Sequence, residues 1–326
     1  MPSSTPALGE PGPRSSFRKD RRSTNRAVAK SIRGRRLGSL IPYLLVLPVT
    51  VVMAVFIYWP MMQSVAISTL NWNLISPSST FVGLRNYTKL FSDVSFLQAA
   101  YNTALYLVIL VPVLVVAPLW IAHLLWPIRA SRAGPVYRAI LFTPAIMATA
   151  VSAVAWLWIF DPLQGILTAA FLSVGAERID WLGDPTLAFA CVVVVSIWKM
   201  LGLNLLLYLA AFESIPAEIL EAATIDGAGA WTQFTRIRVP LITPTILFVL
   251  TSTTIFVSDD VFQIIQVLTQ GGPFGQTQNV LSFLYEKAFK FFQVGPGSAV
   301  AILTFAAVMT VTWLQFRYVE RRVFYG

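Results

Sequence analysis

Six long apolar stretches, separated by short charged segments, dominate this sequence. A helix that crosses a bilayer needs about 20 mostly apolar residues, and six stretches meet this need. Their approximate bounds are 40–58, 99–126, 136–160, 187–212, 240–269 and 298–316. Only 12% of the 326 residues are charged and 56% are hydrophobic, whereas about a quarter of the residues of soluble domains are charged. The sequence therefore predicts an all-α polytopic membrane protein with six transmembrane helices.

Prolines inside these stretches do not exclude spanning helices. Pro112, Pro118 and Pro144 each fall within one. In a membrane bundle, neighbouring helices satisfy the backbone carbonyls that a proline leaves unpaired. We therefore expect each stretch to form one helix.

Lysine and arginine are unevenly divided between the two sides of the membrane. Of the 24 such residues, eighteen fall in the N-terminal tail, in the loops after the second and fourth stretches, and at the C-terminus; five fall on the opposite side. Because cytoplasmic loops carry the excess of basic residues, both termini are predicted to be cytoplasmic. These flanks also account for the net charge of +9, so we expect no nucleic-acid partner.

Residues 1–38 differ from the rest of the chain. They are rich in proline, serine, glycine and arginine and show almost no apolar periodicity. We predict a disordered, basic cytoplasmic tail that lies on anionic membrane lipid, followed by a transmembrane domain over residues 39–326. The basic region is too long for a cleaved signal peptide, so the first helix is predicted to be retained.

No motif for catalysis or metal binding is present. The sequence lacks a G-x-x-x-x-G-K-[ST] phosphate loop, a G-x-S-x-G elbow and an H-E-x-x-H helix. One cysteine, Cys191, and one histidine, His123, cannot build a disulfide or a zinc or haem site within this chain. We expect a protein that is not an enzyme and carries no metal or cofactor, so any ATP that drives it would bind another chain.

The longest predicted cytoplasmic loop, residues 213–240, has the pattern of two short helices around a glycine. Pro216 suits the first turn of a helix, and Gly227 ends that helix. Apolar residues then recur at helical spacing at Trp231, Phe234 and Ile237. Such an apolar face suits docking into a groove on a partner; the alternative is an amphipathic loop that lies flat on the membrane.

This loop resembles the signature of the transmembrane subunits of binding-protein-dependent ABC importers. That signature reads Glu-Ala-Ala, three residues, Gly, nine residues, Ile, one residue, Leu, Pro. The matching positions, with the aspartate before the glycine, are Glu221, Ala222, Ala223, Asp226, Gly227, Ile237 and Pro240. The one departure is Val239, where leucine is usual. The resemblance implies that the loop is a coupling-helix pair seated in a cleft of a cytoplasmic ATPase subunit.

Further segments resemble the carbohydrate and glycerol-3-phosphate branch of this family. They are residues 81–87, 142–144, 156–162, 198–204 and 268–273, so the resemblance covers nearly everything after Leu40. In one departure, Phe262-Gln263 stands where a Phe-Asp pair is common.

The resemblance also implies partners and a location. The partners are a second homologous permease, two ATPases that hold ATP and Mg²⁺, and an extracellular or periplasmic solute-binding protein. The location is the cytoplasmic membrane of a prokaryote. A disaccharide or oligosaccharide, a monosaccharide and a glycerophosphodiester stay open as solutes.

Polar residues inside the fourth and fifth stretches are candidates for the translocation path. A charge there costs from about 2.5 kcal/mol upward, so such residues are functional candidates. The candidates are Trp198, Lys199, Asn204, Asp259, Asp260, Gln263 and Gln266. With Gln270, three of them, Asp259, Gln263 and Gln266, follow helical spacing and are predicted to share one face.

Two interpretations of these residues compete. In the first, Lys199 forms an ion pair with an aspartate that holds the helices together. In the second, the polar stripe lines the translocation path and forms hydrogen bonds with solute hydroxyl groups. A proton- or sodium-coupled carrier is the alternative function, because it would also hold carboxylates in the membrane but would not need the Glu-Ala-Ala loop.

Overall fold

The structure is a computed structural model that describes residues 41–75, 78–129 and 131–319. The predicted basic tail lies outside the described residues. In chain order the elements are α2 (Ile41–Met53), the π-helical turn η1 (Ala54–Tyr58), α3 (Trp59–Ser68), β1 (Leu70–Asn71), β2 (Thr80–Phe81), α4 (Arg85–Leu90), α5 (Val94–Leu125), the 3-10 turn η2 (Trp126–Ile128), α6 (Gly134–Ile146), α7 (Thr149–Ile159), α8 (Ile166–Ser173), α9 (Pro185–Glu213), α10 (Ala217–Ile225), α11 (Ala230–Gln233), the π-helical turn η3 (Phe234–Arg238), α12 (Val239–Leu241), α13 (Thr243–Leu268), α14 (Val280–Tyr285), the π-helical turn η4 (Glu286–Lys290) and α15 (Val294–Val319).

The chain divides into two units, residues 1–63 and residues 64–326. Most of the described part of the first unit is the helix formed by α2, η1 and the start of α3. Its apolar span runs over Pro42–Ser68, so this span continues beyond the predicted end near residue 58. The π-helical turn lies at Ala54–Tyr58 and is continuous with both neighbours.

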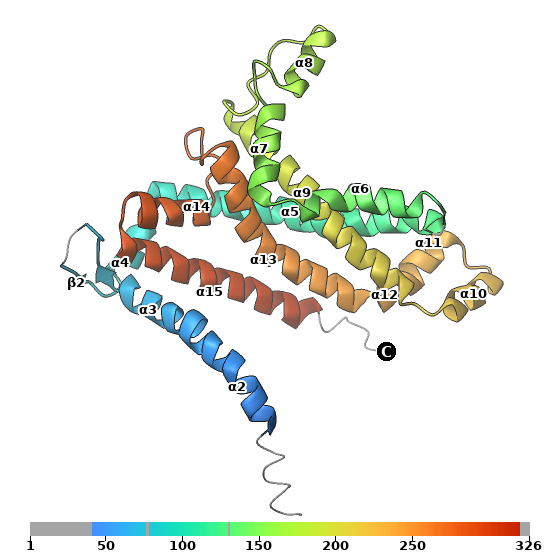
Figure 1. The fold of residues 1–326 in the computed structure, drawn as a ribbon, viewed down its shortest axis with the longest axis horizontal. Helices are drawn as coiled ribbons and strands as arrows, with labels where there is room; N and C mark the ends of the chain where they lie inside the picture. The colour runs from blue at the N-terminus through green and yellow to red at the C-terminus, as the bar shows by residue number, and fades with distance from the viewer. Residues whose placement is uncertain (1–40, 76–77, 130, 320–326) are drawn as a thin grey trace, which may run out of the picture. The chain divides into compact units, whose positions relative to one another are not determined.

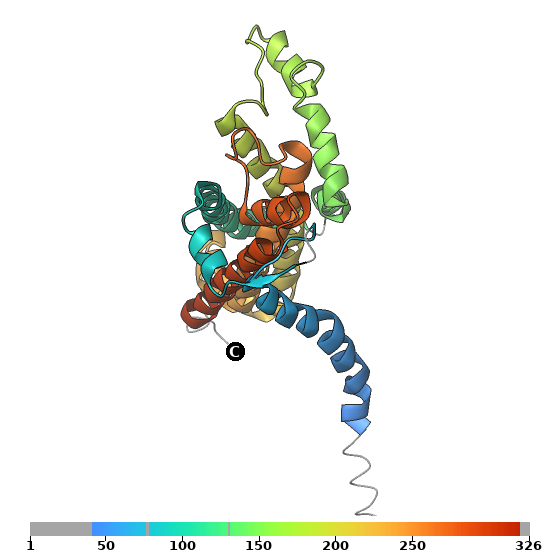
Figure 2. The same cartoon turned by 90° about the vertical axis from the view of Figure 1, so that its left-hand side faces the viewer.

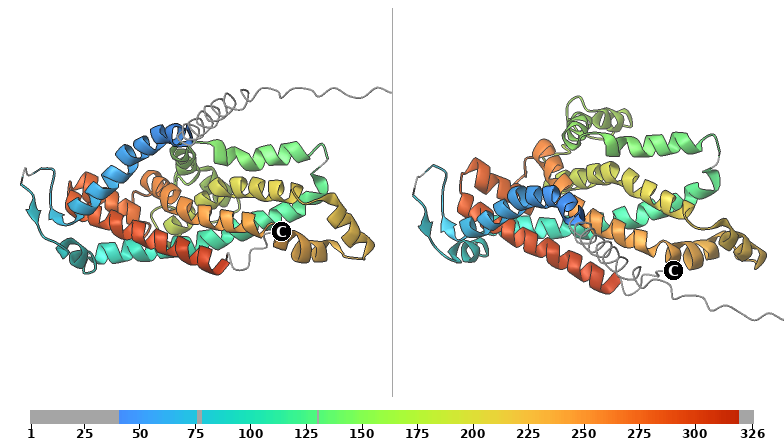
Figure 3. Two further views of the ribbon diagram at one scale, coloured as in Figure 1. Left: turned by 90° about the horizontal axis from the view of Figure 1, so that it is seen from below. Right: turned by 60° about the horizontal axis from the view of Figure 1, so that its bottom comes forward.

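Helix α9 is the centre of the second unit. It packs against α5, α6 and α13, and α13 also packs against α5, α7 and α15 (Figure 1, Figure 3). Val192, Val195 and Leu205 of α9 are fully buried. Gly202 makes the contact with α6 possible, because a Cβ there would lie 2.0 Å from the backbone oxygen of Leu141. The apolar α9 is therefore the helix around which α5, α6 and α13 pack.

Two aspartates fix where long helices begin. Asp93 precedes α5 and accepts hydrogen bonds from the backbone N–H groups of Ser95 and Phe96. Asp184 precedes α9 and caps it in the same way. These side chains satisfy donors that the first turn of a helix leaves unpaired.

The third span is broken, whereas a single helix over residues 136–160 was predicted. Helices α6 and α7 meet at an angle of 100°, and the backbones of Met147 and Ala148 between them are extended. Helix α7 packs against α13 and leads to α8, which extends away from the rest of the second unit (Figure 2). The prediction of one continuous helix is therefore wrong.

The number of spans agrees with the prediction when the bent pair is counted once. Over the ranges that the structure describes, five helices are long and apolar enough to cross a membrane, and α6 with α7 makes a sixth. The other boundaries lie within a few residues of those expected, except at the end of the first span. The predicted all-α polytopic architecture is confirmed.

Candidate functional site

The break in the third span is held by a lysine from α9. The Lys199 ammonium group donates to three backbone carbonyls at the end of α6: 3.0 Å to Pro144, 3.2 Å to Ala145 and 2.6 Å to Met147. Lys199 is only 7% exposed. The last carbonyls of a helix carry partial negative charge and lack intrahelical partners, so a buried cation suits this position.

An aspartate from α13 holds the other side of the break. Thr149 is the first residue of α7, and its hydroxyl donates to the Asp260 carboxylate at 2.9 Å. The N-terminus of a helix carries partial positive charge, which favours an anion nearby. Two side chains of opposite charge thus lie at helix ends of opposite polarity.

The structure does not contain the ion pair of Lys199 with an aspartate that was one of the two predicted interpretations. The side-chain ion pairs within the described ranges are Arg138–Glu213 and Lys287–Asp93. Asp259 is exposed, and Asp260 bonds to Thr149. The ammonium group of Lys199 instead donates hydrogen bonds to the three carbonyls that the helix break leaves free. A break of this kind gives no periodic signal in the sequence, so it could not be predicted.

A small cavity with a mixed polar and apolar lining lies beside the break. Its volume is about 80 Å³, and Lys199, Asn204, Thr253 and Asp260 contribute to its lining. Asn204 is buried and donates to the Leu114 carbonyl at 2.8 Å and to the Thr253 hydroxyl at 3.0 Å. Because ligand pockets typically measure about 300–1,000 Å³, this cavity can hold water but not a sugar ring in the conformation described.

The predicted polar stripe of α13 is only partly retained. Gln263 and Gln266 are half-buried, and neither makes a side-chain hydrogen bond among the residues described. Gln270 lies beyond the end of α13 in a left-handed conformation, with φ of 51°. It therefore does not share the helix face. Trp198, on α9, packs edge-on against Trp156, with ring centroids 5.6 Å apart.

The 213–240 loop contains the predicted helix–glycine–helix. Helix α10 has no buried residue, and Glu221, Ala222 and Asp226 are exposed while Ala223 is half-buried. Gly227 follows in the left-handed region with φ of 79°, and a Cβ there would meet nothing within 4 Å. The glycine is therefore needed for its backbone conformation and not for a close approach.

Part of the apolar face predicted in the second half of this loop packs inward, because Phe234 is buried, whereas Trp231 is 54% exposed. The Phe234 ring stacks on His123 of α5 at 4.2 Å, and Trp231 stacks on Trp120 at 5.4 Å. Ile237 is half-buried and Pro240 is exposed. Aromatic side chains near the end of α5 cover only the Phe234 part of this face. Trp231 stays exposed, as do Ile219 and Ile225 on α10.

A buried arginine that the sequence did not single out supports the base of the loop. Arg238 is 8% exposed and lies over the Trp126 ring at 5.0 Å and the Phe212 ring at 5.7 Å. Burial and the nearby Arg129 lower the pKa of Arg238. From the sequence, Arg238 was only one of the basic residues that flank a span on the cytoplasmic side. Its burial could not be predicted, because the aromatic residues that it contacts, Trp126 and Phe212, come from distant segments.

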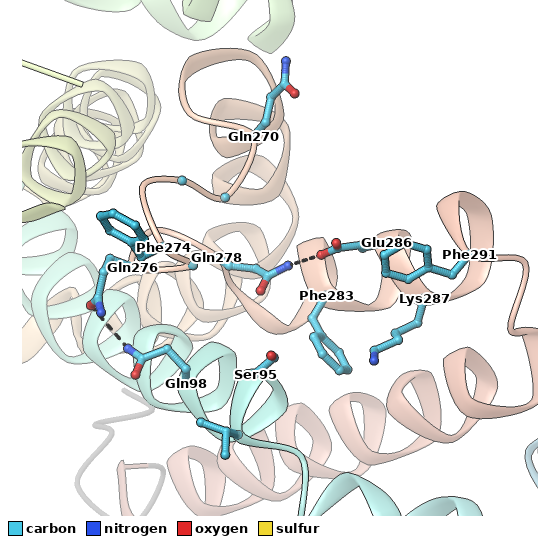
Figure 4. A pocket seen from close by; sticks show the side chains of 14 residues that line it. Ser95, Gln98, Gln270, Phe274, Gln276, Gln278, Phe283, Glu286, Lys287 and Phe291 are labelled. Atoms are coloured by element: carbon cyan, nitrogen blue, oxygen red, sulfur yellow. Dashed lines mark hydrogen bonds between the residues drawn. The ribbon is translucent and has the colours of Figure 1, made fainter. Parts of the chain in front are cut away.

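The end of the second unit that carries α14 holds a further polar pocket. Its volume is about 470 Å³, and its lining comes from the start of α5, the loop after α13, α14 and η4. Figure 4 shows glutamine side chains gathered there: Gln98, Gln276 and Gln278. No sequence signal identified these residues, because they come from segments far apart in the chain.

Comparison with known proteins decides the family. Residues 79–325 match the family described as "Binding-protein-dependent transport system inner membrane component". The chain belongs to this family. It is therefore a multi-pass inner-membrane component of a transporter that works with a binding protein, and it is not an enzyme. This membership excludes the ion-coupled carrier.

Relatives in the family match over most of their length. The sn-glycerol-3-phosphate transport system permease protein UgpA of Yersinia pestis bv. Antiqua (strain Antiqua) is 34% identical over 288 residues, which is 88% of this chain and 96% of that protein. The probable ABC transporter permease protein YurN of Bacillus subtilis (strain 168) is 35% identical over 284 residues, covering 86% and 96%.

A solved structure shows the same fold. A chain from the crystal structure of a bacterial alginate ABC transporter, in complex with an alginate pentasaccharide-bound periplasmic protein, aligns with a TM-score of 0.79 at 21% identity. The alignment covers 90% of this chain and 96% of that chain.

Proposed function

We propose that this chain forms one half of the translocation pathway of an ATP-driven importer for a sugar or a related polyol. A second homologous permease would form the other half. Two cytoplasmic ATPases, which bind ATP and Mg²⁺, would power it, and a binding protein outside the membrane would deliver the solute. The observation that carries the proposal is the exposed α10 followed by Gly227, in a member of a binding-protein-dependent transport family.

The coupling surface of this proposal is α10. Its exposed residues include Ile219, Glu221 and Ile225, and Ile225 is 86% exposed. An amphipathic helix of this kind fits a groove on a partner. Because the aromatic residues after Gly227 attach α11 to α5, movement of α10 would be passed to the bundle. The two permease halves would then alternate the access of the solute path, driven by the binding of ATP.

The solute class follows from the polar groups and the relatives. Gln263 and Gln266 have uncommitted amide groups on α13, and amides both donate to and accept from hydroxyls. UgpA is named for sn-glycerol-3-phosphate, and the alginate transporter was solved with a pentasaccharide on its binding protein. Both solutes carry several hydroxyl groups.

Purification of the native complex tests the proposal. We expect an ATPase and a second permease to co-purify with this chain. In proteoliposomes with the binding protein on the outer side, solute uptake should require ATP inside. Uptake that continues without ATP, or a chain that purifies alone in an active form, would overturn the proposal.

A further inference from the structure

We propose that the pocket at the α14 end is an entry subsite for an uncharged, hydroxyl-rich solute such as a sugar ring. The inference rests on the proposed function and narrows it, because it favours a neutral saccharide over a phosphorylated or acidic solute. The volume of about 470 Å³ lies within the range of about 300–1,000 Å³ that is usual for ligand pockets.

The chemistry of the lining suits hydroxyl groups. Gln98, Gln276 and Gln278 bring three primary amides to one space. The Gln98 amide nitrogen donates to Asn102 at 2.9 Å and to Gln276 at 3.5 Å, and the Gln278 amide nitrogen donates to Glu286. Among the residues described, the Gln276 amide nitrogen and the carbonyl oxygens of Gln98 and Gln278 make no hydrogen bond, so they offer both donors and acceptors to a ligand. A hydroxyl group needs both kinds of partner. Phe274 borders the same space and is 91% exposed, so its ring has an uncovered face. An aromatic face beside several amides can hold the apolar face of a sugar ring while the amides bind its hydroxyls.

The loop that forms the pocket wall is rigidly held. The buried Asn102 side chain donates to the backbone carbonyls of Gly275 and Gln278, each at 2.9 Å. The buried Tyr106 hydroxyl donates to the Thr277 carbonyl at 3.0 Å. Gln270 and Phe274 have φ of 51° and 54°, which is costly for residues other than glycine and is typical of functional sites. Such pre-organisation lowers the entropy lost when a ligand binds.

The charged groups of the pocket are already occupied. The Glu286 carboxylate accepts from the Gln278 amide at 2.6 Å, and the Lys287 ammonium group pairs with Asp93 at 3.2 Å. The lining contains one carboxylate and one ammonium group, so their formal charges cancel. Phosphate and carboxylate groups are usually bound by available lysine or arginine side chains. The pocket therefore favours a neutral solute.

Ligand binding to the purified complex in nanodiscs, without the binding protein, tests the inference. The probes are three neutral saccharides, maltotriose, cellotriose and raffinose, and one anion, sn-glycerol 3-phosphate. The binding of each probe is measured by saturation-transfer NMR. We expect at least one neutral saccharide to bind more tightly than the anion. Gln276→Ala and Phe274→Ala should weaken that binding by about fivefold for each lost contact. Gln164→Ala changes another exposed glutamine, outside the pocket, and should leave binding unchanged.

Three outcomes would overturn the inference: no neutral saccharide binds, the anion binds more tightly, or the Gln276→Ala and Phe274→Ala variants bind saccharide normally. If those variants weaken only the affinity of the complex for its binding protein, the pocket is a protein-docking surface instead. ATP-dependent uptake in proteoliposomes is measured on the same preparations. Normal uptake with failed saccharide binding refutes the subsite alone, whereas loss of ATP dependence refutes the proposed function.

Discussion

Lys199 of α9 and Asp260 of α13 lie on the two sides of one helix break without pairing with each other. Lys199 donates to the carbonyls that end α6, and Asp260 accepts from Thr149 at the start of α7. Each charge faces the helix end of opposite polarity. The two residues stabilise a 100° bend that neither helix would form alone, because the bend exposes backbone carbonyls inside the membrane.

Replacement of Lys199 should destabilise the protein, and an additional substitution of Asp259 should not restore the lost stability. Lys199→Met leaves up to three carbonyls without a partner, at about 1–3 kcal/mol each. We expect a lower yield and a lower melting temperature in detergent, and Lys199→Arg should retain part of the stability. Addition of Asp259→Asn should restore nothing, since Asp259 is exposed. Recovery of stability in the Lys199→Met/Asp259→Asn variant would show that the two residues interact.

Gly227 and Gly229 provide a matched pair for testing the coupling loop. Gly227 has φ of 79°, whereas Gly229 is extended with φ of −65°, and a Cβ at either position would meet nothing within 4 Å. Gly227→Val should cost about 1–2 kcal/mol locally, displace α10 and abolish uptake at normal membrane levels. Gly229→Val should transport normally. Equal uptake by the two glycine variants would show that Gly227 has no special role in coupling.

Glu221→Lys tests the same loop at an exposed position of α10. We expect this variant to insert into the membrane normally and to lose uptake.

The two glutamines of α13 test the solute path. Gln263 and Gln266 are half-buried and make no side-chain hydrogen bond in the described ranges, so their loss should not affect folding. We expect the Gln263→Ala/Gln266→Ala variant to keep its yield and its affinity for the binding protein. Its uptake should fall by roughly fivefold for each hydrogen bond lost to solute. If the double variant transports solute as fast as the unmodified protein, this face of α13 does not line the translocation path.

The Asp93–Lys287 ion pair predicts a dependence of stability on pH. Burial opposes the ionisation of Asp93, but the hydrogen bond and ion pair with Lys287 and the backbone N–H groups of Ser95 and Phe96 lower its pKa below 3.8. A lowered carboxyl pKa stabilises the folded state above the unfolded pKa. This stabilisation should therefore be complete well above pH 3.8 and disappear as the pH falls through the lowered value.

Two variants separate the effects of Asp93. Asp93→Asn keeps a good helix cap but loses the ion pair, so it should cost only about 0.5 kcal/mol because both side chains are partly exposed. Asp93→Ala also loses the cap and should cost about 1 kcal/mol more. Melting temperatures from pH 7 to pH 3 measure both effects. The acid-dependent loss should be smaller in Asp93→Asn than in the unmodified protein, and an equal loss would exclude Asp93 as its source.

Labelling tests the proposed orientation. Ser79 is exposed before β2, so a cysteine there should react with a membrane-impermeant maleimide on intact cells. Cys191 is only 5% exposed and should give a low background. A reporter fused after Gly326 should be cytoplasmic. Reaction at residue 79 only after permeabilisation would reverse the orientation or change the number of spans.

The sequence by itself determined the features that depend on neighbouring residues. The apolar length of each span is local, so six spans could be predicted, with most of their ends within a few residues; the end of the first span and the break in the third were missed. The helix–glycine–helix of residues 213–240 is also local, because proline and glycine act on their own backbone. Gly227, which was predicted to end the first of these helices, has a positive φ. The family signature lies in the same short segment.

Only the tertiary structure decided which polar groups meet. The donor that supports the break after α6 comes from Lys199, more than fifty positions away in the chain, so no periodicity around Pro144 could reveal the bend. In the same way, aromatic rings of α5 stack on Trp231 of α11 and Phe234 of η3, and Asn204 joins three helices. Hydrogen bonds and ring contacts depend on distances in space, and these are set by the packing of whole helices around α9.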